Sequence, residues 1–279
     1  MGADDSANVK ALKAPALTPI SIPTRLAAAP SEPPKYSVTV QDRAGAEVAV
    51  ADPNATRAAV ALMNVHAVVG GAACHWGGPA AFAEIMAAAH ALMFATKGRQ
   101  WHEAFHFVND AGHTENGVYA LRANYAFDGM SYETLRGFRG IESKLTGHGE
   151  SHINPEGILI SNGPLGSGLP QAQGLAIGDK MAGNERVTLC TISDGAMMEG
   201  EAKESVAAIP GLAAKGRVNP FVLILSDNDT KLSGRITDDS FSMQPCFSAL
   251  AHLGWKVIEV ADGHDLQSVY SALEGGIAE

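Results

Sequence analysis

Residues 187–201, Val-Thr-Leu-Cys-Thr-Ile-Ser-Asp-Gly-Ala-Met-Met-Glu-Gly-Glu, decide the fold class of this chain. The run Val187–Ser193 has the length and apolar character of a buried strand, and a helix is predicted at Glu199–Ile209. A second strand, Phe221–Ser226, follows this helix. Apolar strands that alternate with helices are typical of a parallel sheet covered on both faces. We therefore predict an α/β fold with three layers, α/β/α, around a mostly parallel sheet.

The same alternation extends in both directions from this stretch. One helix is predicted to begin at Asp52-Pro53, because a capping residue followed by proline is a common helix start. A second, alanine-rich helix is predicted after Pro79. The other predicted elements are strands at Phe105–Asn109, Ile158–Ser161 and Trp255–Val260, and helices at Gly117–Phe127, Pro170–Met181, Gln244–Leu253 and Asp265–Ile277.

Residues 1–50 differ from the rest of the chain in composition. They hold six prolines and one short alternating run, Tyr36–Val40. Such a segment is typical of an extended arm that lies on another surface, or of a mobile terminus. We expect two parts, a proline-rich arm at 1–50 and a domain at 51–279.

Charge and composition exclude several classes of function. The net charge of −10 argues against a surface for nucleic acid or for an anionic membrane, because both need clustered Lys and Arg. No run approaches the ~18 apolar residues of a membrane span. The N-terminus lacks the apolar core of a secretory signal, and three cysteines are too few for a disulfide framework. A cytoplasmic protein is expected.

Two loops carry residue types that suit a phosphate ligand and a cation. The turn Gly163–Gly168 joins a predicted strand to a helix, where glycines allow backbone N–H groups to approach an anion. Asp194 and, 34 positions later, Asn228 follow two predicted parallel strands. Carboxylate and amide oxygens at one sheet edge suit a hard cation that also binds a diphosphate. Both loops also have a simpler interpretation, since these residues are common in tight turns.

Ser193-Asp194-Gly195 and Asp227-Asn228 resemble the cation-binding motif of the thiamine diphosphate enzymes, in the form found in the transketolase family. Five further segments resemble transketolase motifs in the same order along the chain: Ala73–Pro79, Asp110–His113, Ser143–His148, Gly163–Gly168 and Asp262–Asp265. The resemblance runs from about Asp52 to the end of the sequence.

The resemblance implies roles for single residues. Asp194, the Asn228 side chain and the Thr230 backbone carbonyl would bind Mg²⁺. The residues implied at the thiamine diphosphate are Gly163, Leu165, Gly166, Gly195, Glu199 and Asn228. For Glu199 the resemblance also implies a carboxylate network at a subunit contact. Four histidines, His75, His113, His148 and His264, would line the substrate channel, where imidazoles can move protons near neutral pH.

The chain also departs from the family pattern. Ser193 and Asp229 stand where glycines are usual, Trp76 replaces a proline, and Thr114-Glu115 replaces Gly-Ser. The chain corresponds to the pyrophosphate-binding domain alone, without its expected final strand and without the pyrimidine domain. We therefore expect a homo- or hetero-oligomer whose pyrimidine domain belongs to a separate subunit or to the remainder of a longer chain. An exposed apolar face is expected where that partner docks.

The expected activity is transfer of a two-carbon ketol unit between small sugar phosphates. Two alternatives stay open at this point. The chain could belong to the homodimeric first component of a 2-oxo-acid dehydrogenase, which is similar in this region. It could instead be a degenerate, non-catalytic scaffold or regulatory subunit, a reading that Ser193 and Asp229 favour.

Overall fold

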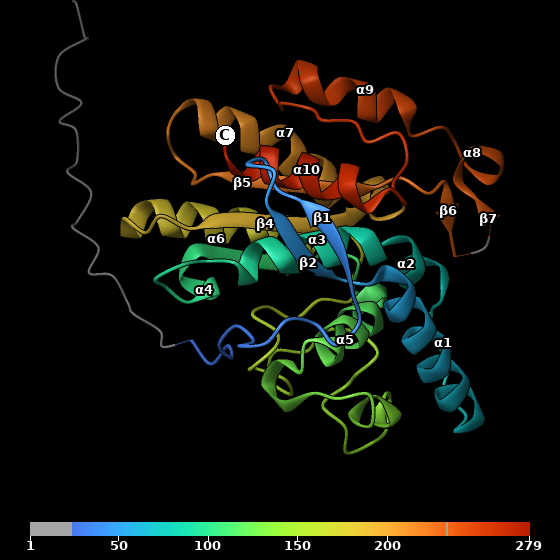
Figure 1. Cartoon of the computed structure of the whole chain (residues 1–279). Coiled ribbons are helices and arrows are strands. Elements are labelled where there is room, and N and C mark those ends of the chain that lie inside the picture. The colour runs from blue at the N-terminus through green and yellow to red at the C-terminus, as the bar shows by residue number, and fades with distance from the viewer. Residues whose placement is uncertain (1–23, 233) are drawn as a thin grey trace, which may run out of the picture.

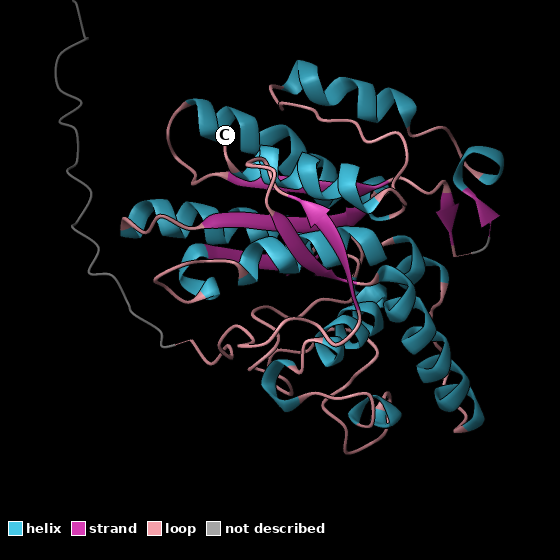
Figure 2. Ribbon diagram, viewed as in Figure 1, coloured by secondary structure: helices cyan, strands magenta, loops and turns pink. Residues whose placement is uncertain are grey.

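A parallel three-stranded sheet forms the centre of the protein. The computed structural model describes residues 24–232 and 234–279, so the first 23 residues of the predicted arm lie outside the described residues. The strands β3 (Phe105–Asn109), β4 (Val187–Ser193) and β5 (Phe221–Ser226) pair in the order β3-β4-β5. Figure 2 shows the sheet between helices. The predicted α/β fold is confirmed.

Each face of the sheet is covered by its own group of helices. Along β4, Leu189 packs into one core while Cys190 and Ile192 pack into the other, as expected when successive side chains point to opposite faces. On the Leu189 side lie α3 (Ala83–Phe94), α5 (Glu115–Asn124) and α10 (Leu266–Ile277). On the other side lie α6 (Gly168–Ala182), α7 (Gly200–Ala214) and α9 (Gln244–Leu253). The three predicted layers are therefore present.

A third core joins α1 (Pro53–Val69) to α5 and to the loops that follow α5. The Asp52 side chain accepts a hydrogen bond from the Asn54 backbone N–H, and Pro53 occupies the first helical position, as predicted. The remaining short elements are α2 (Gly77–Ala81), α4 (Trp101–Ala104), β6 (Thr230–Lys231), β7 (Gly234–Arg235) and α8 (Ile236–Asp239). Of the helices among residues 24–232 and 234–279, none has the length and apolar character needed to cross a membrane.

The described part of the predicted arm is not a free extension. β1 (Ser37–Gln41) and β2 (Glu47–Ala51) form an antiparallel hairpin, and Val40, Val50 and Ala51 are buried in the same core as α3. β1, which contains the alternating run, pairs with β2, which begins ten residues after β1 begins. The apolar face of the hairpin packs against the domain. The division of the chain at residue 50 stays a prediction.

Two predicted strands are not formed. Ile158–Ser161 is irregular, with a bend at Leu159 and Ile160, and the Ile158 backbone N–H bonds to the Asn154 carbonyl instead of to a strand. Trp255–Val260 is irregular. It lines, together with β5, a cavity of about 1130 Å³. Because β5 pairs only with β4 among the described strands, this second segment lacks the hydrogen-bonded neighbour that a strand needs.

A close approach of α6 to the end of β3 fixes one layer on the sheet. A Cβ atom at Gly168, the first residue of α6, would lie 2.7 Å from the Asp110 Cα. The contact would be with a backbone atom of Asp110, so it could be relieved only by moving the backbone of α6 or of the residue after β3. Gly174, in the middle of the same helix, has nothing within 4 Å of the corresponding position.

Alanine substitutions at these two glycines should therefore have opposite effects. Gly168→Ala should lower the free energy of unfolding by about 1–3 kcal/mol, because the added methyl forces the helix from the strand. Gly174→Ala should raise it by about 0.5–1 kcal/mol, because alanine loses less entropy in a helix. Urea unfolding of both variants is the measurement. Equal effects would contradict the close approach.

Candidate functional site

Three acidic residues follow the carboxyl ends of the three paired strands. Asp110 follows β3, Asp194 follows β4 and Asp227 follows β5. The strands are parallel and paired to their last residues, so the three loops leave the sheet at one edge (Figure 1). Ligands of open parallel sheets bind at this edge.

Asp194 joins the loops that follow β4 and β5. Its carboxylate accepts hydrogen bonds from the backbone N–H groups of Gly195 (2.8 Å) and Asn228 (3.0 Å). Burial raises the pKa of the Asp194 carboxyl, although these N–H groups act in the opposite direction. The Asn228 side-chain oxygen accepts from the Thr230 N–H at 2.9 Å. The predicted ligands Asp194, Asn228 and Thr230 thus lie in one cluster.

The chemistry of this donor set fits Mg²⁺ bound together with a diphosphate. The set offers one carboxylate, one amide oxygen and one backbone carbonyl, all hard oxygen ligands. A single negative charge leaves positions for diphosphate oxygens and water. Within the described part of the chain, no group of three or more His, Cys, Asp or Glu side chains could hold a metal by itself. A site here would depend on the neutral oxygens and on the diphosphate.

The two departures from the glycine pattern have structural explanations. The Ser193 hydroxyl accepts a hydrogen bond from the Ala196 N–H at 3.1 Å and closes the turn after β4. Asp229 has a φ of +51°, a left-handed conformation that glycine adopts most easily and Asp tolerates. Its carboxylate accepts from the Thr237 N–H (2.9 Å) and hydroxyl (2.7 Å). These bonds lower the pKa of the Asp229 carboxyl.

The glycine-rich turn is held by Asp110, to which sequence reasoning gave no role. The Asp110 carboxylate accepts from the backbone N–H groups of Gly166 and Leu169, both at 2.9 Å. The sequence predicted that backbone N–H groups of this turn face an anionic ligand. For Gly166 and Leu169 this prediction is wrong, because both N–H groups bond to Asp110. Gly166 has a φ of +80°, and a Cβ there would lie 2.6 Å from the Glu199 Cβ. Only glycine allows this approach, which brings two predicted cofactor-binding residues together.

The other predicted cofactor-binding residues lie on the same loops. Gly163 has a φ of +143° and lies beside the His148 ring, while Leu165 is half exposed at 40%. If Gly195 carried a Cβ atom, the nearest neighbour would be the Ser193 hydroxyl oxygen, 4.0 Å away. The turn at 163–166 therefore lies between His148 and Glu199.

Three of the four predicted channel histidines lie together. The rings of His75 and His113 have centroids 5.1 Å apart. Burial lowers the pKa of His113 to about 4, and the neighbouring His75 and His148 act in the same direction. Burial also lowers the pKa of His75 and of His148, and the Arg139 guanidinium contributes to both. All three imidazoles are therefore neutral near pH 7 and can accept or donate a proton.

The fourth histidine, His264, has different contacts. It is on the loop before α10, where its Nδ1 atom is 3.1 Å from the Arg57 Nη2 atom. Its side chain is largely exposed. His264 thus contacts an arginine, whereas His75 and His113 contact each other.

Sequence reasoning missed a buried carboxylate next to the histidine group. Glu115 begins α5, and its Oε2 atom accepts from the side-chain amides of Asn109 (3.0 Å) and Asn162 (3.1 Å). Acidic residues are common in the first turn of a helix, so this position resembles an ordinary helix start. The available signal was the polar Asn109 at the end of an otherwise apolar strand.

Comparisons with known proteins agree with this geometry. Residues 53–279 match the family model described as transketolase, thiamine diphosphate binding domain. A transketolase of Rhodobacter capsulatus is 28% identical over 225 residues, covering 77% of this chain and 32% of that protein. Transketolase 1 of Pasteurella multocida is 30% identical over 237 residues, covering 79% and 34%.

Solved structures give the same result. The transketolase from Leishmania mexicana superposes with a TM-score of 0.67 at 26% identity, covering 82% of this chain and 35% of that chain. The transketolase from Campylobacter jejuni superposes with a TM-score of 0.65 at 25% identity. The chain spans about a third of the length of the relatives that it matches.

The pKa of His113 predicts a pH dependence of stability. Between pH 6.5, the ordinary value, and about 4, the unfolded chain binds a proton at His113 that the folded chain does not. Stability should therefore fall as pH falls through this window, by at most about 1.4 kcal/mol per pH unit from this residue. His113→Gln should reduce the loss seen by urea unfolding between about pH 7 and about pH 5. The exposed His252→Gln is the control, and an equal reduction there would contradict the assignment.

Proposed function

Because the chain belongs to the transketolase family, whose thiamine diphosphate binding domain it matches over residues 53–279, we propose that it is the cofactor-binding part of a ketol-transferring enzyme. The proposed reaction moves a two-carbon ketol unit between sugar phosphates. The observation that carries this proposal is the joining of Asp194 and Asn228 at the carboxyl edge of the sheet, in a domain of this family.

We propose that Asp194, Asn228 and the Thr230 carbonyl hold Mg²⁺, and that the metal holds the cofactor diphosphate. Gly163, Leu165, Gly166 and Gly195 would lie beside the diphosphate, and of the three glycines Gly195 has the most open surroundings. When bound, thiamine diphosphate supplies the electron sink for the carbanion chemistry. The protein contributes orientation and electrostatics.

The neutral histidines would handle protons on the substrate. A sugar hydroxyl must lose a proton during ketol transfer, and a neutral imidazole can accept it. His75, His113 and His148 are available for this because burial lowers their pKa values and leaves the rings unprotonated near pH 7, although the same shift weakens each ring as a base. We propose that they face the reacting carbons, and that Glu199 joins a carboxylate network with a partner subunit.

The partner is a further proposal. The chain spans about a third of its relatives' length, so we propose that the pyrimidine domain comes from another subunit or from further residues of a longer chain. An exposed apolar face supports a docking partner: on α1, Leu62, Val65 and Val69 are 73%, 64% and 83% exposed. A cytoplasmic oligomer agrees with the proposed sugar phosphate substrates.

Neither alternative is favoured by the comparisons. The relatives and solved structures described above are transketolases, which supports ketol transfer over a 2-oxo-acid dehydrogenase. The degenerate scaffold was favoured by Ser193 and Asp229, yet both side chains stabilise the loops in which they lie.

Substitution of Asp194 tests the cation site. Asp194→Ala should abolish Mg²⁺-dependent binding of thiamine diphosphate, and of pyrophosphate as a smaller probe, because the only carboxylate of the site is lost. The variant should unfold about 1–3 kcal/mol more easily, since it leaves buried N–H groups unpaired. Titration calorimetry with and without Mg²⁺ measures the affinity, and near-UV circular dichroism checks the fold.

Asp227→Ala is the matched control for this experiment. Asp227 follows the neighbouring strand, its carboxylate accepts from Gln244 at 3.2 Å, and it is not in the proposed ligand set. Binding should survive in this variant. Unchanged Mg²⁺-dependent affinity in folded Asp194→Ala would end the assignment.

The need for a partner domain can be tested with the 279-residue chain alone. Supplied with thiamine diphosphate and Mg²⁺, it should bind the cofactor weakly and transfer no ketol unit between pentose phosphates. Activity should appear when a polypeptide with the pyrimidine domain is added. Enzyme assays combined with light scattering are the measurement, and a fully active monomer would contradict the proposal.

A further inference from the structure

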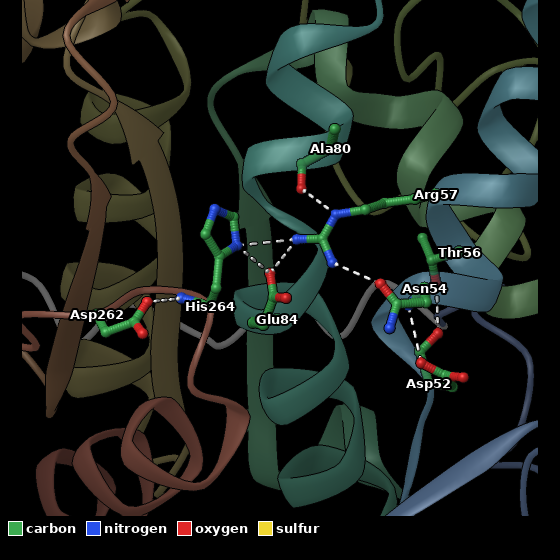
Figure 3. A network of polar contacts seen from close by, with 8 residues as sticks. All are labelled: Asp52, Asn54, Thr56, Arg57, Ala80, Glu84, Asp262 and His264. Carbon is green, nitrogen blue, oxygen red and sulfur yellow. Dashed lines mark hydrogen bonds and ion pairs between the residues drawn. The ribbon is translucent and has the colours of Figure 1, made fainter.

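A polar network connects three distant parts of the chain next to the cation loop. Figure 3 shows Arg57 from α1, Glu84 from α3 and His264 from the loop before α10 meeting at one point. Glu84 is buried, with only 4% of its side chain exposed, and Arg57 is mostly buried at 21%. A buried carboxylate needs a charged or hydrogen-bonded partner, and Arg57 provides both.

Each donor nitrogen of Arg57 has an acceptor. Its Nη2 atom is 2.5 Å from the Glu84 Oε2 atom and 3.1 Å from the His264 Nδ1 atom. Its Nε atom donates to the Ala80 carbonyl at 3.1 Å, and its Nη1 atom donates to the Asn54 side-chain oxygen at 3.4 Å. Three contacts other than the one with His264 therefore hold the guanidinium in position.

This arrangement selects one tautomer of His264. An Arg guanidinium has only N–H donors, so the Nδ1 atom of a neutral His264 must accept the bond and the ring proton must be on Nε2. The opposite tautomer would direct an Nδ1–H toward Glu84, but that separation is 3.5 Å, and the Glu84 Oε2 atom already accepts from Arg57. The Arg57 contact is the better hydrogen bond.

We propose that Arg57 and Glu84 are positioning residues that hold neutral His264 with its proton on Nε2, as a hydrogen-bond donor toward substrate oxygens. Figure 3 shows the other ring nitrogen of His264 pointing away from Arg57 and Glu84. His264 lines the same cavity as Asp227 and Asn228, next to the proposed cation ligands. The His264 backbone N–H also bonds to the Asp262 carboxylate at 2.9 Å, which fixes the loop.

This role differs from that of the three grouped histidines. A histidine with its proton on Nε2 can donate to a carbonyl, hydroxyl or phosphate oxygen, but it cannot accept a proton at that atom. His264 would therefore orient the sugar phosphate while His75, His113 and His148 move protons. The substrate part of this inference rests on the proposed function, whereas the tautomer does not.

The tautomer can be measured directly in the chain alone. Long-range ¹H–¹⁵N correlation spectra of the ¹⁵N-labelled protein, at about pH 8 where imidazoles are usually neutral, distinguish protonated from unprotonated ring nitrogens. His264→Gln assigns the signals. We expect a protonated Nε2 and an unprotonated Nδ1 at His264. A protonated Nδ1 in the unsubstituted chain would overturn the proposal without any further variant.

Three variants test whether Arg57 sets the tautomer. Arg57→Met should remove the preference and move protonation toward Nδ1, facing Glu84, whereas Arg57→Lys should preserve it because lysine is also only a donor. Arg136→Met, an exposed arginine paired with Glu133, is the matched control and should leave His264 unchanged. An unchanged His264 in folded Arg57→Met would overturn the proposal.

The spectra test the His264 tautomer, and the calorimetry of the Asp194 variant tests the proposed function, so the two proposals can fail independently. The spectra need no cofactor, so loss of thiamine diphosphate binding in the Asp194 experiment would leave the tautomer result standing. Conversely, a wrong tautomer would not affect cofactor binding at Asp194, which makes no contact with Arg57 in the hydrogen-bond network.

Discussion

The buried carboxylate of Asp194 connects two strand ends, and the geometry of the candidate site depends on this connection. It accepts one backbone N–H from its own loop, at Gly195, and one from the loop after β5, at Asn228. The connection is possible because β4 and β5 are parallel and paired up to Ser193 and Ser226, so both loops leave the sheet together. A fully buried N–H without a partner costs about 1–3 kcal/mol, and the carboxylate gives a partner to two N–H groups that are partly buried. As a consequence, Asn228 is held beside Asp194, and Thr230 is bonded in turn to the Asn228 side chain.

The candidate site has two regions that differ in their electrostatic character. At the strand ends, a carboxylate and neutral oxygens suit a cation and its diphosphate. At the histidine group, burial and the Arg139 guanidinium keep the imidazoles neutral. In the proposed reaction a neutral base is needed there, because a protonated imidazole could not accept a substrate proton. His264 has a different environment because a guanidinium, rather than another imidazole, contacts its ring. Motif matching could not show this difference, because each of the four histidines belongs to a matched motif, whereas the Arg57 that contacts His264 is 207 positions away in sequence.

Sequence patterns predicted the layers and the strand ends because these depend on local periodicity and on residues adjacent to each strand. They failed for Trp255–Val260 and Ile158–Ser161, where the composition suits a strand but no neighbour pairs with it. Strand formation needs a partner, and a partner is not visible in the segment itself. Glu84 was missed for a related reason. It lies in an alanine-rich helix that reads as apolar, and its partner Arg57 is 27 positions away in sequence.

The departures from the family motif illustrate how a loop can keep its shape while its sequence changes. At Asp229 the left-handed backbone costs a non-glycine residue about 1–2 kcal/mol. The two bonds from Thr237 to the Asp229 carboxylate offset this cost. The Ser193 hydroxyl acts similarly in the turn after β4, where it bonds to the Ala196 N–H. Both replacements therefore preserve the loops that position Asp194 and Asn228, so the sequence differences at these two positions give no reason to regard the cation site as degenerate.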